Sequence, residues 1–279
     1  MHIYLNNRTV PEEEALVPVT DRGFLYGDGV YETMRAYKGE VFLLQEHLNR
    51  LMRSAGLIGL GLPKDEQGII DAVMETLEAN SLQDAIIRIS VTRGSGPRGI
   101  DPTVATSPTF VVMTWPFSPY DPVLFERGVE LIIANTRRNS SSSLDPAIKS
   151  MNFLNNILAK GEAARAGAFD ALMLNPEGHI AECTVSNIFF VRDSTVHTPS
   201  IATGILAGVT REQVISIARG EGYMVREGLY LPSELASADE VFLTGTSIEV
   251  LPVSRVDVYE FGVGPVTRRL MEAYSESTP

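Results

Sequence analysis

Residues 144–166 read LDPAIKSMNFLNNILAKGEAARA, and they contain Lys149, one of only four lysines in the chain. After Lys149, apolar residues recur at the spacing of one helix face. Lys149 is therefore expected just ahead of a buried helix. Partial desolvation there favours the neutral amine of a lysine, which is a nucleophile toward carbonyl carbon. The alternative is an ordinary lysine that extends into solvent from a helix start. The residues expected on the buried face are Met151, Leu154, Ile157, Leu158 and Ala163.

Length and composition limit the class of protein. The chain has 279 residues, of which 44% are hydrophobic and 21% charged, as in globular proteins with one large domain or two ordinary ones. The net charge of −12 argues against general binding to nucleic acid or to an anionic membrane. Cys183 is the only cysteine, which leaves no intrachain disulfide and no cysteine-based zinc site, and no metal site is expected. The start resembles no secretory signal and no apolar run is long enough to span a membrane, so a cytoplasmic protein is expected.

The order of elements predicts an α+β or mixed α/β fold. Lys38-Gly39 is a two-residue turn between two strand-like runs and predicts a hairpin. Helical spacing predicts helices over about 45–55, 64–80 and 265–274. The proline-bearing stretch 117–123 predicts a division into an N-terminal α/β domain (1–117), a linker (118–123) and a C-terminal domain (124–279). Strands are expected near 2–5, 30–37, 85–92, 109–114, 129–135, 170–175, 187–191, 238–244 and 250–253.

Two stretches suit an anion. GILAGVTREQ (204–213) predicts a capped helix start, with Thr210 and Gln213 as a capping box. The free N–H groups and positive dipole end of such a helix favour a phosphate, although an ordinary capped helix has the same pattern. The loop LTGTSIE (243–249) follows a strand and offers the hydroxyl of Thr246 in the same way, or is simply a turn.

A few charged residues stand in apolar surroundings. Glu182 precedes an apolar strand, and a buried carboxylate is costly unless it meets a cation. Asp170 and Glu240 also flank strands and are expected at the surface. Arg50 could bind a phosphate bidentately, and the glycine-rich loop with Arg98 could clamp a substrate carboxylate. Arg88 and Arg35 add positive charge from within strands. A lysine for an aldehyde, a carboxylate for a pyridine nitrogen, a phosphate cup and arginines together are what an enzyme that uses pyridoxal 5′-phosphate requires.

Seven motifs in order resemble the class IV, or fold type IV, pyridoxal phosphate enzymes, and they extend over nearly the whole chain. That family comprises D-amino-acid transaminases, branched-chain aminotransferases and aminodeoxychorismate lyases. The resemblance implies a two-domain fold like that of D-amino-acid aminotransferase, a homodimer, and a cofactor held between the two domains. The motifs are DRGFLYGDGVYE (21–32), EHLNRL (46–51), VTRGSGPRG (91–99), IKSMNFLNNILAK (148–160), AECTVSNIFFV (181–191), GILAGVTR (204–211) and GTSIEVLPV (245–253).

The resemblance assigns roles to individual residues. Lys149 looks like the Schiff-base lysine and proton carrier, and Glu182 like the partner of the pyridine nitrogen. Arg50 is expected on the phosphate. The cofactor site would be completed by the amides of Val209 and Thr210, by Thr246, and by Ser186 and Asn187 beside the ring.

The substrate is less closely indicated. Tyr31 and Arg98 match two parts of the carboxylate trap of D-amino-acid transaminases, but Ile100 replaces the histidine of the third part. Arg35 and Arg88 resemble arginines of the branched-chain group. The sequence therefore predicts an aminotransferase acting on an amino acid and a 2-oxo acid, slightly favouring D-amino acids with relaxed selectivity. The alternatives are an L-branched-chain aminotransferase and, second, a 4-amino-4-deoxychorismate lyase.

Overall fold

The computed structural model describes residues 1–105 and 107–279, which divide by contact density into two compact units. The first unit is Met1–Ser118 together with Ile148–Phe153 and Pro279, and the second is Pro119–Ala147 and Leu154–Thr278. Each unit has its own sheet and its own helices, so the mixed α/β fold class is confirmed. The segment that carries Lys149 groups with the first unit, and the boundary at 118–123 stays a sequence-based prediction.

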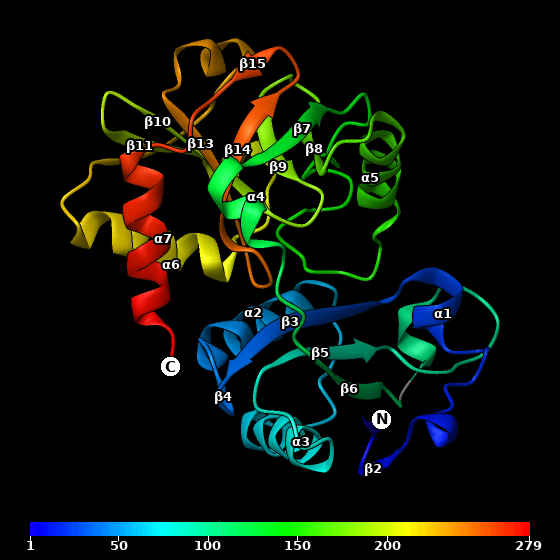
Figure 1. Cartoon of the computed structure of the whole chain (residues 1–279). Coiled ribbons are helices and arrows are strands. Elements are labelled where there is room, and N and C mark those ends of the chain that lie inside the picture. The colour runs from blue at the N-terminus through cyan, green and yellow to red at the C-terminus, as the bar shows by residue number, and fades with distance from the viewer. Residues whose placement is uncertain (106) are drawn as a thin grey trace. The chain divides into compact units, whose positions relative to one another are not determined.

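The first unit is built on a six-stranded antiparallel sheet with the strand order β2-β1-β6-β5-β3-β4 (Figure 1). The hairpin between β3 and β4 turns at Lys38 and Gly39, which both have positive φ, as a two-residue turn requires. This confirms the predicted hairpin. The strands are β1 (His2–Leu5), β2 (Arg8–Pro11), β3 (Gly29–Tyr37), β4 (Glu40–Val41), β5 (Ala85–Thr92) and β6 (Thr109–Pro116), and the helices are α1 (Arg22–Tyr26), α2 (Leu44–Leu57) and α3 (Glu66–Ala79), with 3-10 turns at Glu12–Glu14 and Pro102–Val104.

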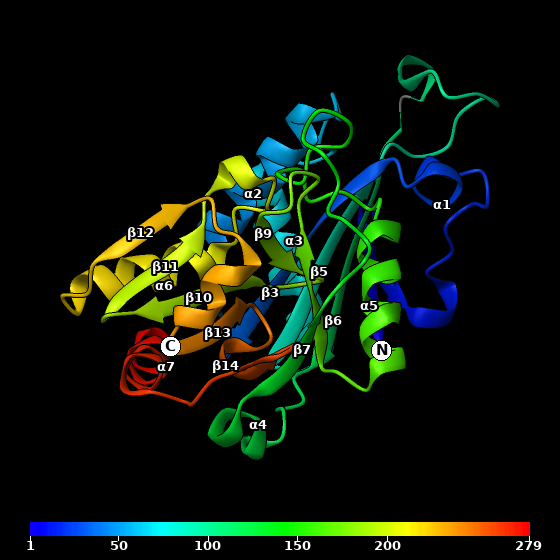
Figure 2. The same cartoon turned by 90° about the horizontal axis from the view of Figure 1, so that it is seen from above.

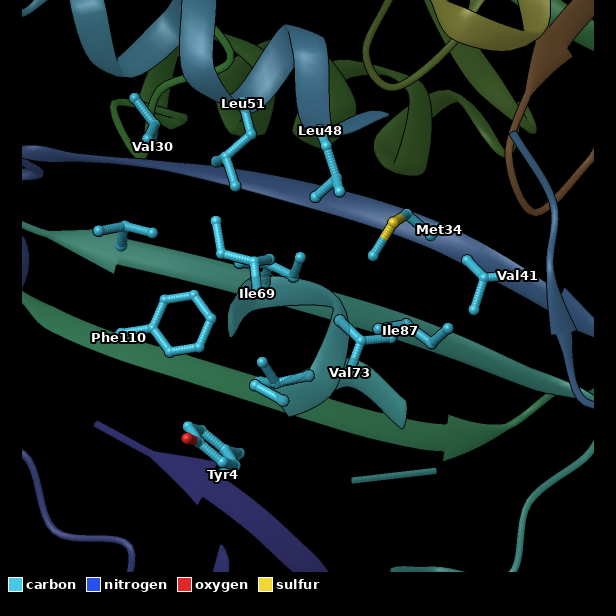
Figure 3. Close-up of a cluster of buried hydrophobic side chains, with 14 of the residues drawn as sticks. Tyr4, Val30, Met34, Val41, Leu48, Leu51, Ile69, Val73, Ile87 and Phe110 are labelled. Carbon is cyan, nitrogen blue, oxygen red and sulfur yellow. The ribbon is translucent and has the colours of Figure 1, made fainter. Parts of the chain in front are cut away.

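The two faces of this sheet differ because side chains alternate along each strand. Met34 and Ile87 are opposite each other on β3 and β5 and belong to one buried apolar cluster. Leu48 and Leu51 of α2 pack into the same cluster, together with Ile69 and Val73 of α3 (Figure 3). Both helices therefore cover one face. The residues between the apolar ones along β3 and β5 point to the other face.

The second unit is built on a nine-stranded mixed sheet with the order β12-β11-β10-β13-β14-β7-β8-β9, and β15 pairs with β14. Helices α6 and α7 pack on each other and on β13, while α5 packs on β7 and β8 (Figures 1 and 2). Among the described residues, no helix is long and apolar enough to span a membrane. The strands are β7 (Val129–Ile133), β8 (Asp170–Leu174), β9 (Ile180–Cys183), β10 (Asn187–Arg192), β11 (Thr195–Pro199), β12 (Val225–Gly228), β13 (Glu240–Gly245), β14 (Glu249–Val256) and β15 (Tyr259–Glu260), and the helices are α4 (Pro122–Arg127), α5 (Leu154–Ala166), α6 (Val209–Gly220) and α7 (Pro265–Ser277), with 3-10 turns at Ile201–Thr203 and Pro232–Ser237.

The buried face predicted for the helix after Lys149 is wrong for Leu154, Ile157 and Leu158, although Ala163 is buried as predicted. Helix α5 begins only at Leu154, and it buries Asn156, Ala159 and Ala163. The two alanines pack against Ala171 and Met173 of β8, where small side chains let the helix approach the strand closely. The larger apolar residues lie on the opposite side of the helix and are exposed: Leu154 at 66%, Ile157 at 59% and Leu158 at 54%.

The capping box predicted at Thr210 is also absent. Helix α6 begins at Val209 with Gly208 as its N-cap, and no side chain caps it. Thr210 therefore lies inside the first turn and is buried. The absence of a cap favours the predicted phosphate site, because no capping side chain occupies the first N–H groups of α6.

Asp170 and Glu240 are buried, contrary to the expectation of surface positions. Asp170 Oδ1 accepts hydrogen bonds from the Thr184 hydroxyl (2.6 Å) and from the backbone N–H of Ala171 (2.8 Å). The carboxylate of Glu240 accepts from the backbone N–H groups of Val266 (3.1 Å) and Thr267 (2.7 Å). Val266 and Thr267 lie in the first turn of α7, so the carboxylate of Glu240 on strand β13 caps the start of that helix.

Candidate active site

The backbone on both sides of Lys149 is fixed within the first unit. The N–H of Tyr31 donates to the carbonyl of Lys149 (3.0 Å), and the N–H of Met151 donates to the carbonyl of Gly29 (2.9 Å). The N–H of Lys149 itself donates to Ser54 Oγ of α2 (3.2 Å). The segment thus lies along the beginning of β3, which holds the lysine in one place.

The side chain of Lys149 lies at the ring of Tyr31. Lys149 Nζ is 4.7 Å from the ring centroid, and the guanidinium carbon of Arg88 is 3.9 Å from the same centroid. Phe153 meets this ring edge-on, with 6.0 Å between the two centroids. Burial raises the pKa of the Tyr31 hydroxyl, so this side chain is a neutral phenol at neutral pH. The amine of Lys149 and the guanidinium of Arg88 therefore both lie at the neutral phenol ring of Tyr31.

Strand register explains part of this cluster. Tyr31 and Arg35 are four residues apart on β3, and Arg88 faces Thr33 between them on β5, so all three share the sheet face opposite to α2 and α3. Arg35, however, is buried between aromatic rings, with its guanidinium carbon 4.3 Å from the centroid of Tyr37 and 3.1 Å from that of Phe117. The structure brings Arg88 to the Tyr31 ring, where Lys149 Nζ also lies, and it places Arg35 in an aromatic stack.

Arg98 lies on an exposed loop, and its neighbour Ile100 is 82% exposed. The loop is held at its base because Arg22 donates to the carbonyls of Gly99 (2.9 Å) and Ile100 (3.0 Å). In the part of the chain that the structure describes, the cations over the Tyr31 ring are Lys149 and Arg88 rather than Arg98.

Arg50 belongs to a buried ion-pair network that the sequence did not reveal. Its Nε and Nη2 donate to the two carboxylate oxygens of Glu32 (2.8 and 2.7 Å), and His47 Nδ1 lies 2.8 Å from Glu32 Oε2. Burial alone would raise the pKa of Glu32, but the charge and hydrogen bonds of Arg50 outweigh it and lower the pKa to about 2. Glu32 is a carboxylate among the buried positions of β3, and that was the available signal. The contact of Arg50 with a phosphate stays a prediction.

Glu182 is a buried carboxylate at the centre of a second cluster, within the second unit. Arg138 Nε donates to its Oε1 (2.8 Å), and Asn187 Nδ2 (3.2 Å) and the backbone N–H of Leu206 (3.1 Å) donate to its Oε2. These donors favour the ionised carboxylate. Arg138 was not singled out in the sequence, where it follows Arg137 and has no motif to mark it.

Asn187 links this carboxylate to the start of α6. Its Nδ2 also donates to the carbonyl of Leu206 (3.0 Å), and a Cβ on Gly208 would collide with its Oδ1. Gly208 therefore lets the first turn of α6 approach Asn187, with Val209 and Thr210 buried there. A carboxylate that favours a cation and a helix start that favours an anion are thus joined by one side chain.

The remaining residues of this cluster fit a bound ligand. Thr244 faces Asn187 across β10 and β13, on the same sheet face, and its buried hydroxyl has no hydrogen-bond partner among the described residues. Ser186 is buried in the turn before β10, and Thr246 lies in the turn after β13. An unpaired buried hydroxyl, an ionised carboxylate and an uncapped helix start suit pyridoxal 5′-phosphate, whose ring nitrogen can be cationic and whose phosphate is an anion.

An amine placed for carbonyl chemistry and a cradle for a phosphorylated pyridine define the class of enzymes that use pyridoxal 5′-phosphate. The profile of the amino-transferase class IV family matches residues 29–256. The chain belongs to this family. Its cofactor is therefore pyridoxal 5′-phosphate and its activity is that of an aminotransferase, as the sequence motifs predicted.

The chain is similar to aminotransferases that are named for two different groups of amino acid. A "Putative branched-chain-amino-acid aminotransferase" of Methanocaldococcus jannaschii is 42% identical, over 99% of this chain and 96% of that protein. A D-alanine aminotransferase of Bacillus licheniformis is 34% identical, over 99% of this chain and 97% of that protein.

Among solved structures, the branched-chain amino acid aminotransferase of Escherichia coli aligns with a TM-score of 0.95 at 30% identity, covering 99% of this chain and 94% of that one. The branched-chain amino acid aminotransferase of Thermobaculum terrenum, solved in its pyridoxal 5′-phosphate form, has a TM-score of 0.87 at 31% identity over 99% of this chain and 92% of that one. The fold is that of the fold type IV aminotransferases, as predicted.

Proposed function

We propose that this aminotransferase moves the amino group between an L-branched-chain amino acid and a 2-oxo acid. The observation that carries the proposal is the Tyr31 ring, which lies against Lys149 Nζ on one hand and the guanidinium of Arg88 on the other. Arg88 thus lies at the same ring as the reactive amine, where its guanidinium could pair with a substrate carboxylate. The similarity to branched-chain aminotransferases supports the same substrate.

We assign the chemistry to the chain's own residues as follows. Lys149 would hold the aldehyde carbon of the cofactor and, once displaced by the substrate amine, would take the proton from the substrate Cα and return it on the cofactor side. Glu182 would hold the ring nitrogen, and the N–H groups of Val209 and Thr210 the phosphate. When bound, the cofactor supplies the electron sink that makes the Cα proton acidic.

D-amino acids are the second candidate substrates. Tyr31 lies beside Lys149, and Arg98 is present, so two parts of the D-amino-acid carboxylate trap exist in the chain. Ile100 in place of the third part predicts relaxed selectivity. The identity to D-alanine aminotransferases supports this candidate, at a lower level than the branched-chain relative.

Half-reaction rates with L-leucine and D-alanine, followed by the visible absorbance of the bound cofactor, test the choice. We expect L-leucine to react faster, and Arg88→Met to lower its kcat/KM by about 10- to 100-fold, because a charge-assisted pair of roughly 1.5–3 kcal/mol is lost. Arg98→Ala and the exposed control Arg53→Ala should leave this rate unchanged. A faster reaction of D-alanine that depends on Arg98 would establish the second candidate instead. Turnover of 4-amino-4-deoxychorismate without any 2-oxo acid would indicate the lyase.

We also propose a homodimer of the cytoplasm. The three exposed apolar residues of α5 are large and adjacent in helical spacing, and such a patch is costly in water unless a partner covers it. A second copy of the chain is the partner that the family resemblance implies. Cys183 is a buried free thiol, which suits a reducing compartment.

A further inference from the structure

Arg138 is a buried cation whose guanidinium faces the carboxylate of Glu182. Its backbone N–H donates to the carbonyl of Leu174 at the end of β8 (2.9 Å), which fixes the main chain beyond β7. The ion pair between Arg138 Nε and Glu182 Oε1 measures 2.8 Å, and both side chains are more than nine-tenths buried. The pair is therefore little screened by solvent.

The guanidinium is anchored from its other end by the first turn of α5. Arg138 Nη1 donates to Asn155 Oδ1 (3.2 Å) and Asn156 Oδ1 (3.4 Å). Asn156 is buried and donates through Nδ2 to the carbonyl of Thr184 (2.7 Å), next to β9. These two asparagines belong to the motif IKSMNFLNN. The family resemblance assigns a role to Lys149 of this motif and none to the asparagines, and their hydrogen bonds with Arg138 give them one.

The ion pair with Arg138 favours the charged form of Glu182. A buried carboxylate without a cation tends to take up a proton, and a protonated carboxyl group carries no charge to balance a cationic pyridine nitrogen. Asn187 and the N–H of Leu206 are neutral donors, whereas Arg138 brings a full positive charge to the carboxylate.

We propose that Arg138 is a positioning residue that keeps Glu182 ionised and oriented, with Asn156 anchoring the guanidinium. This rests on the proposed role of Glu182 at the ring nitrogen. The mechanism thereby gains a residue outside the family motifs, placed behind the carboxylate.

The test compares Arg138→Met with Arg138→Lys and with Arg137→Met, whose side chain is exposed and serves as the matched control. In the loaded enzyme, Arg138→Met should move the acid limb of the pH–rate profile upward by about 1–3 pH units, because a buried carboxylate loses its cation. Its kcat should fall about tenfold or more with little change in KM, because the electron sink matters most in the transition state. Arg138→Lys should keep the acid limb of the wild type, and Arg137→Met should change neither quantity.

Infrared spectroscopy of the full chain before cofactor is added provides a readout apart from activity. Arg138→Met should show the carbonyl stretch of a protonated carboxylic acid at a pH where the wild type does not, and Glu182→Gln in the same background should remove it. An unchanged pH–rate profile and infrared spectrum in Arg138→Met would overturn the proposal. If Arg138→Met does not fold, Arg138→Lys decides, because it keeps the positive charge: a shifted acid limb in that variant would overturn the proposal. Full activity of Glu182→Gln alone would instead refute the role proposed for Glu182.

Discussion

At the scale of single residues, the position of Lys149 is set by its backbone. Hydrogen bonds join this segment to β3 on one side and to Ser54 of α2 on the other, so the amine is presented from a fixed point beside Tyr31. Fixed placement of a reactive group contributes to catalysis, because the entropy of orienting it is not lost during the reaction.

Lys149→Ala should lower transamination by about 10³-fold or more, because the residue that holds the cofactor aldehyde and the base are the same group. Cofactor binding through the phosphate and ring contacts should persist, at reduced affinity. Steady-state rates and the visible spectrum measure the two effects. Lys38→Asn, which keeps a residue that tolerates the positive φ of the hairpin turn, is the control and should remain active. Near-normal turnover in Lys149→Ala would exclude the assignment.

At the scale of elements, helix α7 depends on a residue from a strand. The carboxylate of Glu240 accepts from the N–H groups of Val266 and Thr267, and Gly264 leaves room for it, since a Cβ there would overlap the carboxylate. The helix has no capping side chain of its own at Gly264. The strand β13 therefore supplies the cap as well as part of the surface on which α7 packs.

Glu240→Gln should lower the free energy of unfolding by about 1.5–3 kcal/mol, because charge-assisted hydrogen bonds to two buried N–H groups are replaced by one neutral acceptor. Urea unfolding followed by circular dichroism gives the value. The exposed Glu177→Gln provides the comparison and should change it by less than about 0.5 kcal/mol. Equal stability of the two variants would show that the cap contributes nothing.

At the scale of the whole molecule, the apolar side of α5 is the feature that calls for a second chain. Leu158→Glu places a charge in that patch and should convert a dimer into monomers, because burying an unpaired charge costs more than the contact gains. Sedimentation velocity measures the change. Arg165→Gln, exposed on the same helix, should leave the dimer intact. A wild-type monomer at micromolar concentration would contradict the homodimer.

The stability of the whole chain should fall with acid in two stages. Burial lowers the pKa of His47 and His197 from 6.5, so the unfolded chain binds these protons first and stability decreases as the pH falls below about 6.5. The pKa of Glu32 is lowered from 4.5 to about 2, so its contribution of about 3 kcal/mol is complete above pH 4.5 and is lost between pH 4.5 and 2.

Urea unfolding at a series of pH values should therefore show a decline below about pH 6.5 and a steeper one below pH 4.5. Glu32→Gln should be less stable at neutral pH, because Arg50 keeps its burial without its partner, and its curve should lack most of the acid part of the decline. Glu12→Gln, at an exposed site, should reproduce the wild-type curve. A Glu32→Gln curve parallel to that of the wild type would show that Glu32 does not cause the loss of stability below pH 4.5.

Local features of the sequence determined the hairpin at Lys38-Gly39, the course of α2, and the motifs that identify the family and its cofactor. Each depends on residues near one another in the chain, where turn geometry, helical period and motif spacing act directly. The tertiary structure alone decided which face of α5 is buried, because the short distance to β8 admits alanine and excludes Leu154, Ile157 and Leu158.

The tertiary structure alone also decided which polar groups are buried. Glu240 finds its donors 26 residues away, and Glu182 finds Arg138 at a separation of 44. A carboxylate's free energy in the interior depends on whether a donor or a cation reaches it, and no local pattern contains that partner. The sequence by itself therefore determined the chemistry that Lys149 and Glu182 are suited to. Only the fold decided which neighbours hold Glu182 charged.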